Sequence, residues 1–159
     1  MFAKYLSICA VLGALLFASS CDRKEESVAP KMQKEVEVIE GKSKMYIDAV
    51  NARDLDTIVD QWSERAVYKN PYTEELVNGR KGIRSEFKKI FSNNNQAKIH
   101  VDEKTIRFPI EEKAVEEGVA TIIVPGKNPV KRKYKMIYVN ENGNWQILHT
   151  NRLGFGLED

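Results

Sequence analysis

Cysteine and histidine are scarce in this chain of 159 residues, which has two of each: Cys9 and Cys21, and His100 and His149. So few thiols exclude a disulfide-rich scaffold. The two histidines are distant in sequence and have no cysteine partner, so the ligand spacing of a metal site is missing. The sequence therefore predicts no disulfide, no metal site and no cofactor.

An excess of charge of either sign is also missing. The 25 basic and 23 acidic residues are spread along the chain and leave a net charge of +2. A protein that binds nucleic acid needs a basic patch or stripe to meet the phosphates, so nucleic acid is not an expected partner. With 42% hydrophobic and 30% charged residues, the chain is expected to form one domain with a single core.

An apolar run long enough to cross a membrane is absent as well. Lys4 precedes an apolar run over residues 6–17, which is shorter than the ~20 residues that a bilayer core requires and is typical of a secretion signal. The following Ala-Ser-Ser-Cys, residues 18–21, resembles the lipobox at which bacterial lipoprotein precursors are cut and acylated. This resemblance implies a signal peptide over residues 1–20. The alternative is ordinary cleavage nearby, which would give a soluble secreted protein.

Lipidation of Cys21 would attach the protein to a membrane of the bacterial cell envelope, with its domain outside the cytoplasm. Residues 22–34 are charged and poor in apolar groups, so we expect a flexible tether over residues 21–34 with a reach of ~20 Å. The folded domain is expected over residues 35–154, followed by a tail at 155–159. The membrane is therefore an expected partner.

Apolar spacing predicts three helices. The first begins at Val36 and turns Tyr46 inward, with Ser43 on the same face. Asp54 is a good N-cap for the second, whose buried stripe ends at Trp62. The third is predicted over residues 81–92.

Extended segments account for most of the remaining chain. A strand over residues 66–70 places Tyr68 and Asn70 on one face, because side chains alternate along a strand. The last two strands are joined by a hairpin turn over residues 140–144 with a glycine at position 143. Helices followed by a meandering sheet predict an α+β domain. The other segments are 97–102, 105–111, 114–124, 130–139 and 145–152.

The order of these elements resembles the nuclear transport factor 2-like superfamily, which includes ketosteroid isomerases and polyketide cyclases of the SnoaL type. The resemblance covers roughly residues 36–153. It implies a cone-shaped α+β barrel, in which three N-terminal helices pack in the concave face of a curved, mainly antiparallel sheet. It also implies a cavity between them and, in many members, a homodimer paired through the outer sheet face. The matching positions are Tyr46, Asn51, Asp54, Leu55, Ile58, Val59, Ala66, Pro71, Gly79, Ile83 and the hairpin over 136–148.

The catalytic groups of the ketosteroid isomerases are mostly missing here. Those enzymes use a tyrosine as hydrogen-bond donor, an aspartate before a proline as base, and a protonated aspartic acid as second donor. Tyr46 matches the tyrosine, but Asn70 occupies the position of the base and Lys135 that of the second acid. Because an amide has no useful basicity near neutral pH, isomerase activity of that type is disfavoured.

His149 is the best remaining acid/base candidate, since a histidine titrates near neutral pH. It lies two residues before Asn151 on the last predicted strand, on the same face as Trp145. If this face lines the cavity, Tyr46 and His149 form the candidate catalytic pair. Ordinary hydrogen bonding at the surface or in the core is an equal alternative for His149.

The basic run over residues 131–135 leaves two orientations open. Plain alternation buries Tyr134, Met136 and Tyr138, whereas the hairpin register of the resembled family turns Lys135 inward. An inward Lys135 would be a cation at the cavity wall that attracts an anionic ligand. An outward basic run could instead meet anionic lipid headgroups.

Three functions follow from these observations. The first is a membrane-anchored envelope lipoprotein whose cavity binds a small, mainly apolar molecule without transforming it. The second is a cyclase, dehydratase or isomerase that uses Tyr46 and His149, and the third is an interaction or dimerisation module that uses Tyr134 and Tyr138 on its outer sheet face. Core filling is the default for the aromatic residues. The candidate ligand-binding residues are Tyr46, Trp62, Tyr68, Asn70, Phe87, Lys135, Trp145, His149 and Asn151.

Overall fold

The structure is a computed structural model that describes residues 25–70, 73–92 and 96–151. The predicted signal peptide, Cys21 and the predicted tail at 155–159 lie outside the described residues. The elements are α1 (Glu25–Ala52), α2 (Leu55–Asp60), β1 (Trp62–Lys69), β2 (Leu76–Asn78), α3 (Gly79–Ser92), β3 (Lys98–Ile110), β4 (Lys113–Ile123), β5 (Val130–Glu141) and β6 (Asn144–Asn151).

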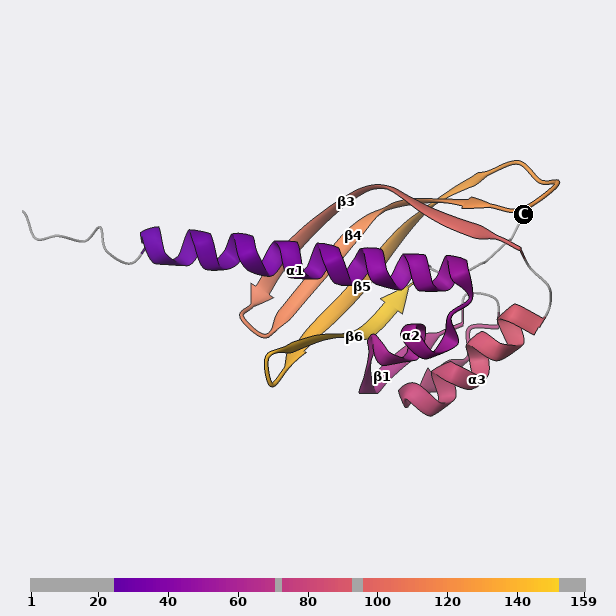
Figure 1. The fold of residues 1–159 in the computed structure, drawn as a ribbon, viewed down its shortest axis with the longest axis horizontal. Helices are drawn as coiled ribbons and strands as arrows, with labels where there is room; N and C mark the ends of the chain where they lie inside the picture. Colours follow the sequence, from indigo (N-terminus) through magenta and orange to yellow (C-terminus); the bar gives the residue numbers. More distant parts are fainter. Residues whose placement is uncertain (1–24, 71–72, 93–95, 152–159) are drawn as a thin grey trace, which may run out of the picture.

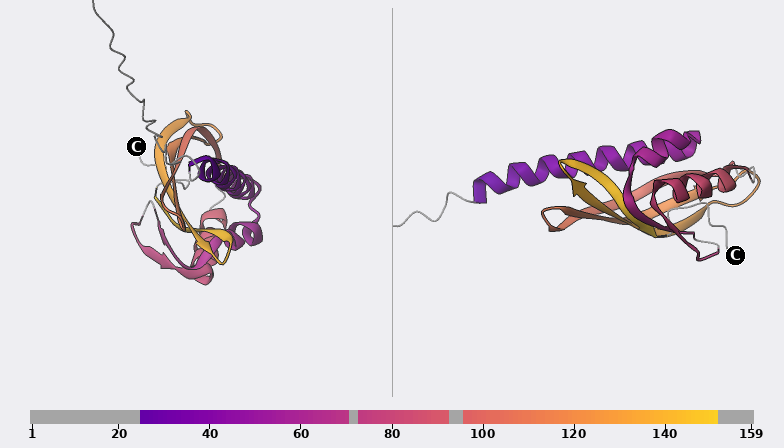
Figure 2. Two further views of the ribbon diagram at one scale, coloured as in Figure 1. Left: turned by 90° about the vertical axis from the view of Figure 1, so that its left-hand side faces the viewer. Right: turned by 90° about the horizontal axis from the view of Figure 1, so that it is seen from below.

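The strands form one sheet in the order β2-β1-β6-β5-β4-β3. β1 and β6 run parallel, whereas the other neighbouring strands pair antiparallel. α1 lies along the concave side of the curved sheet, and α3 packs beside β1 (Figures 1 and 2). The predicted α+β class is confirmed. The sheet is nevertheless open and mixed, so it does not form a closed barrel. Along the chain, β1 and β2 lie between α2 and α3, so the three helices do not all precede the sheet.

α1 begins earlier than the sequence predicts. A flexible tether was expected over residues 21–34, but the helix already starts at Glu25, so this prediction is wrong for residues 25–34. Charged residues such as lysine and glutamate are good helix formers, and a shortage of apolar groups did not exclude a helix. Trp145 Nε1 donates to Glu35 Oε2 at 2.6 Å and holds this half of α1 on the sheet. The first turns of α1 extend beyond the sheet (Figure 1).

α2 is shorter than predicted, and Trp62 is a strand residue. Asp54 caps α2 through its side chain, as expected, but the helix ends at Asp60 and Trp62 opens β1. The backbone oxygen of Gln61 accepts a hydrogen bond from the Ile147 nitrogen at 2.7 Å. The chain therefore enters the sheet one turn earlier than the helical stripe indicates.

β3 contains a β-bulge between Val101 and Glu103. The two segments predicted at 97–102 and 105–111 are therefore parts of one strand. Gly118 of β4 pairs with Lys104, just beyond this bulge, and a Cβ at position 118 would lie 2.2 Å from the backbone oxygen of Glu103. The close approach of the two strands thus requires glycine.

The other predicted elements are confirmed. The segments 114–124, 130–139 and 145–152 correspond to β4, β5 and β6 to within two residues at each end. The turn between β5 and β6 contains Gly143 with φ of +84°, as the hairpin prediction requires. The core lies between the helices and the concave face of the sheet. Its largest fully buried apolar side chains are Trp62, Tyr46, Tyr68, Tyr138, Phe87, Ile39, Ile58, Ile83, Met136 and Ile147.

Candidate functional site

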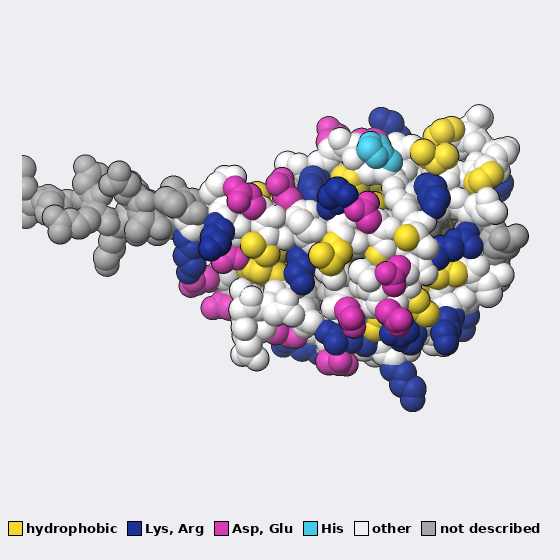
Figure 3. All heavy atoms as spheres, in the orientation of Figure 1, with side chains coloured by type: hydrophobic (Ala, Val, Ile, Leu, Met, Phe, Trp, Pro, Cys, Tyr) yellow, Lys and Arg dark blue, Asp and Glu magenta, His cyan; other side chains and the backbone are white. Residues whose placement is uncertain are grey.

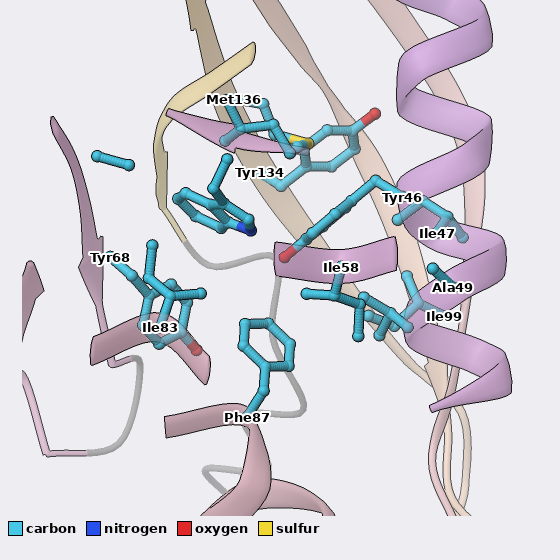
Figure 4. Packing of buried hydrophobic residues seen from close by; sticks show 14 of the residues in the cluster. Tyr46, Ile47, Ala49, Ile58, Tyr68, Ile83, Phe87, Ile99, Tyr134 and Met136 are labelled. Carbon is cyan, nitrogen blue, oxygen red and sulfur yellow. The ribbon is translucent and has the colours of Figure 1, made fainter. Parts of the chain in front are cut away.

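Four of the predicted pocket residues pack against one another in the core: Tyr46 from α1, Trp62 and Tyr68 from β1, and Phe87 from α3 (Figure 4). Successive ring centroids lie 6.0, 6.0 and 5.7 Å apart. None of these side chains is more than 2% exposed. Contacts of this geometry are typical of aromatic packing. The four rings therefore fill the region in which the sequence predicted a cavity.

The hydroxyl of Tyr46 points into this cluster (Figure 4). Among the described residues, no acceptor receives its proton. Burial, with a smaller contribution from Tyr68, raises the pKa of Tyr46 well above its ordinary value. A phenol that stays protonated can donate a hydrogen bond but cannot act as a base near neutral pH. Tyr46 is thus a possible donor enclosed in an apolar shell.

Asn70 holds a loop together at the end of β1. Its amide donates to the carboxylate of Glu86, and its side-chain oxygen accepts from the Thr73 nitrogen at 3.0 Å. Glu86 is buried on the inner face of α3, and its other oxygen lies 3.3 Å from Lys89 Nζ. Glu86 was not among the residues predicted from the sequence, although its helical spacing from Ile83 places it on the buried face.

Trp145 lies on the inner face of the sheet but outside the aromatic cluster of Tyr46. Its ring centroid is 5.8 Å from that of Phe108, and its indole nitrogen donates to Glu35 of α1. The residue is 2% exposed. Trp145 therefore attaches the N-terminal half of α1 to the sheet.

His149 and Asn151 lie on the sheet face that points away from the helices, so their predicted orientation is wrong. The register of the β5–β6 pair shifts between two neighbouring residues: Tyr138 pairs with Ile147, but Ile137 pairs with His149. Because the additional residue of a bulge reverses the alternation beyond it, His149 does not share the face of Ile147. The sequence pattern does not predict this bulge.

Thr150 occupies the inward position instead, where it is 1% exposed and donates to the backbone oxygen of Lys135 at 3.3 Å. The Nδ1 atom of His149 lies 2.9 Å from the backbone oxygen of Val67 on β1. Tyr46 packs on the opposite face of the sheet. The structure therefore does not bring the candidate catalytic pair, Tyr46 and His149, together.

Plain alternation is correct on β5. Tyr134, Met136 and Tyr138 are buried on the inner face, while Lys135 faces the other side with its Nζ 2.9 Å from Glu117 Oε1. The register taken from the family resemblance is therefore wrong for Lys135. The outer face also lacks Tyr134 and Tyr138, which the interaction hypothesis had placed there.

A fully buried carboxylate that the sequence analysis missed lies beneath α1. Glu116 of β4 is 0% exposed. Its Oε1 atom accepts from Ser43 Oγ at 2.8 Å and from the Tyr134 hydroxyl at 2.6 Å, and its Oε2 atom accepts from the Tyr138 hydroxyl at 3.2 Å. We call these four side chains the Glu116 cluster. All four are buried.

The two tyrosines of the Glu116 cluster stay protonated. Burial, followed by the neighbouring Glu116 carboxylate, raises the pKa of both Tyr134 and Tyr138. The sequence did contain a signal for this cluster, because Glu116 alternates with the apolar inward positions of residues 114–122. An acid at such a position must be hydrogen-bonded or paired.

A groove of about 570 Å³ runs between α1 and β3, and the buried Ser43 is among the residues that border it. We call it the α1–β3 groove. Asn51 fixes the two elements on either side of it, since its Nδ2 donates to the Ile99 oxygen and its Oδ1 accepts from the Ile99 nitrogen, both at 2.8 Å. On this side of the molecule, charged side chains of both signs surround hydrophobic ones (Figure 3). The lining residues are Glu40, Ser43, Lys44, Ile47, Asp48, Asn51, Ile99, His100, Val101, Asp102, Glu103 and Lys104.

Two further hollows lie along α1. One of about 390 Å³ is bounded by residues such as Met32 and Ile110, and one of about 470 Å³ lies between α1 and α2 and includes Met45. Neither of these two hollows is lined by a buried polar side chain. The α1–β3 groove differs from them because one buried polar residue, Ser43 of the Glu116 cluster, is among its lining residues.

Within residues 25–70, 73–92 and 96–151, no three or more side chains of His, Cys, Asp or Glu lie close enough together to hold a metal ion. No helix in the same part of the chain is both long and apolar enough to cross a membrane.

A family model described as a SnoaL-like domain matches residues 44–145. A comparison with curated protein sequences finds no match. Among solved structures, an NTF2-like protein of unknown function from Pseudomonas putida KT2440 is similar, with a TM-score of 0.66 and 13% identity over 72% of this chain and 82% of that one.

Two further similar structures have other descriptions. A candidate scytalone dehydratase from Novosphingobium aromaticivorans has a TM-score of 0.65 and 15% identity over 77% of this chain and 85% of that one. A domain of unknown function with a cystatin-like fold from Nostoc punctiforme has a TM-score of 0.61 and 21% identity over 72% and 73% of the two chains. At these identities the likeness shows the fold alone.

Proposed function

Because this chain belongs to the SnoaL-like domain family, which includes ligand-binding as well as isomerase and dehydratase members, we propose that it is a small-molecule-binding protein. Its site is the α1–β3 groove, and it holds a mainly apolar molecule without transforming it. One observation carries this proposal: the groove has apolar side chains on both of its walls, Ile47 on α1 and Ile99 and Val101 on β3.

The size and lining of the groove fit a binding site. Small-molecule sites commonly enclose ~300–1,000 Å³ and combine apolar walls with a few fixed polar groups. Ile47 on α1 and Ile99 and Val101 on β3 are among its apolar lining residues, and Asn51 is among its polar ones. The amide of Asn51 is held in place by two hydrogen bonds to the Ile99 backbone. The groove therefore combines apolar walls with a fixed polar group.

Binding is favoured over catalysis because the groups expected to carry a reaction do not converge. Tyr46 is enclosed by the aromatic cluster, and His149 faces the opposite side of the sheet, beside Val67. A general base must lie within hydrogen-bond reach of the proton that it removes. An arrangement that separates the candidate donor from the candidate base supports a binding protein.

An octanol-binding experiment tests the proposed site. Lys104 lines the groove, so Lys104→Trp should fill part of it and weaken the binding of 1-octanol at least about tenfold. Lys88→Trp is the matched control, because Lys88 is exposed on α3. The dissociation constants can be measured by ligand-observed NMR. Equal affinities of the two variants, or no octanol binding by the wild-type protein, would overturn the proposal.

We further propose that the protein is a lipoprotein of the bacterial cell envelope, anchored through lipidated Cys21 with its domain outside the cytoplasm. The lipobox-like residues 18–21 support this. With α1 starting at Glu25, the domain would be carried on a helical stalk that begins shortly after the lipid.

Cell fractionation tests this anchor. Cys21→Ser should move the protein from the membrane fraction to the soluble fraction, because the acylated side chain is lost. Cys9→Ser serves as the control and should leave the protein in the membrane fraction. Continued sedimentation of the Cys21→Ser variant with the membranes would contradict the anchor.

A further inference from the structure

We infer that the turn between β4 and β5, together with the adjoining outer face of the sheet, docks on an anionic lipid surface. None of the residues concerned lines the α1–β3 groove, so the inference goes beyond the proposed function. We call this region the hairpin surface. Its residues are all exposed: Lys98, Ile123, Pro125, Lys127, Lys131 and Lys133.

The chain around this turn contains basic residues and no acidic ones. Over residues 118–140 the sequence has five lysines and arginines, all of them within 127–135, and no aspartate or glutamate. Clusters of about four or more such side chains are attracted to anionic lipid headgroups. The segment therefore has the charge that a lipid surface of this kind recognises.

The strands place three of the lysines together on the face that points away from the helices. Lys131 and Lys133 are alternate residues of β5 and share this face with Lys135. Lys98 of β3 pairs with Ile123, which is on the same face of β4. The lysines of the hairpin surface therefore come from neighbouring strands and the turn beside them.

Carboxylates neutralise only part of this charge. Asp102 and Glu103 are the acidic residues of β3 beside the hairpin surface, and Lys131 Nζ lies 3.4 Å from Asp102 Oδ2. In the part of the chain that the structure describes, the other three lysines of the hairpin surface form no ion pair. Four lysines therefore face two carboxylates, which leaves a positive excess.

The turn adds exposed apolar side chains to these lysines. Ile123 is 44% exposed, and Pro125 is exposed as well. The turn is ordered, because the Lys127 nitrogen donates to the Val124 oxygen at 3.0 Å and Gly126 has a φ of +78°. Apolar groups beside basic ones can enter the boundary between headgroups and acyl chains. A nucleic acid would meet the lysines but would leave the apolar side chains in water, so a lipid surface is favoured.

The hairpin surface and the N-terminal end of α1 lie at opposite ends of the molecule. The turn between β4 and β5 is at the right-hand end in Figure 1, whereas the first turns of α1 extend from the left-hand end. A contact with lipid at the hairpin surface is therefore separate from the proposed anchor at Cys21.

Vesicle co-sedimentation of the full chain carrying Cys21→Ser tests the inference without a lipid anchor. At low ionic strength this protein should bind vesicles of equal parts phosphatidylglycerol and phosphatidylcholine at least about tenfold more tightly than vesicles of phosphatidylcholine alone. The preference should shrink as salt is added, because mobile ions screen the attraction. Equal binding to the two kinds of vesicle would overturn the inference and leave the proposed function of the groove standing.

Two pairs of substitutions in this protein locate the contact. Lys127→Gln combined with Lys133→Gln should weaken binding to the anionic vesicles about tenfold or more, because two cations of the hairpin surface are lost. Lys34→Gln combined with Lys81→Gln is the matched control, since it removes the same charge at exposed positions on α1 and α3. The control should change binding by less than about twofold. Equal weakening by the two pairs would overturn the inference.

Ile123→Thr separates a lipid surface from other polyanions. Threonine keeps the β-branched shape that suits a strand, but it loses apolar surface, so vesicle binding should weaken at least about threefold. The competing polyanion is a single-stranded DNA of about 20 nucleotides. Vesicle binding that is unchanged by Ile123→Thr, or DNA bound more tightly than the anionic vesicles, would overturn the inference.

Discussion

At the scale of single residues, Glu116 determines the polar character of the interior. Its two oxygens receive hydroxyl groups from one helix and one neighbouring strand, and these hydroxyls are buried with it. A carboxylate that lost these donors would be a buried, unsatisfied charge. The side chains of Ser43, Tyr134 and Tyr138 therefore depend on Glu116 for an acceptor, as it depends on them for donors.

The alkaline stability of the protein tests this mutual dependence. Burial and Glu116 raise the pKa of Tyr134, so the folded state keeps its proton at a pH where the unfolded chain loses it. The resulting stabilisation is fully present below the ordinary tyrosine pKa of ~10 and is lost as the pH rises towards the folded value. The free energy of unfolding therefore decreases as the pH rises above ~10.

Tyr134→Phe removes this contribution. The difference in unfolding free energy between wild type and Tyr134→Phe should be about 1–2 kcal/mol at pH 8. It should shrink by up to ~1.4 kcal/mol for each pH unit above ~10. Urea unfolding of both proteins between pH 8 and pH 11 measures this difference, and the other titrating groups cancel in the comparison. A difference that stays constant over this range would contradict a hydroxyl donor at Tyr134.

At the scale of elements, periodicity was a sufficient guide to most of the fold but not to the faces of β6. The alternation on β5 placed Tyr134, Met136 and Tyr138 inward, as observed. The same reasoning failed for His149 and Asn151, because the β5–β6 bulge reverses the alternation. A bulge depends on how two strands pair, and the sequence of either strand alone does not contain that information.

The candidate site was predictable only in part, for a related reason. Ser43 was placed on the inner face of the first helix, and an acid at position 116 interrupts an apolar alternation. Each signal belongs to a different element. Their meeting depends on the path of α1 over β4, which is set by tertiary contacts such as the bond from Trp145 to Glu35. The aromatic residues were pocket candidates with core filling as the default, and core filling is confirmed for Tyr46, Trp62, Tyr68 and Phe87.

At the scale of the whole molecule, the fold places a long helix over the concave side of an open sheet (Figures 1 and 2). Asn51 attaches the C-terminal end of α1 to β3, and Trp145 attaches its N-terminal half to the sheet. Between these two attachments the helix and β3 leave a groove, whereas the interior beneath is packed. We therefore propose that a ligand binds at the edge of the core and not at its centre.

Amide chemical-shift mapping of the protein with 1-octanol tests this assignment most directly, because it reports every region of the described chain in one titration. We predict the largest shifts at the groove-lining residues of α1, such as Lys44 and Asp48, and at residues 99–104 of β3, with smaller changes at Tyr68 and Phe87. Shifts concentrated on Tyr68 and Phe87 or on the outer face around Lys135, with none along the α1–β3 groove, would contradict the account.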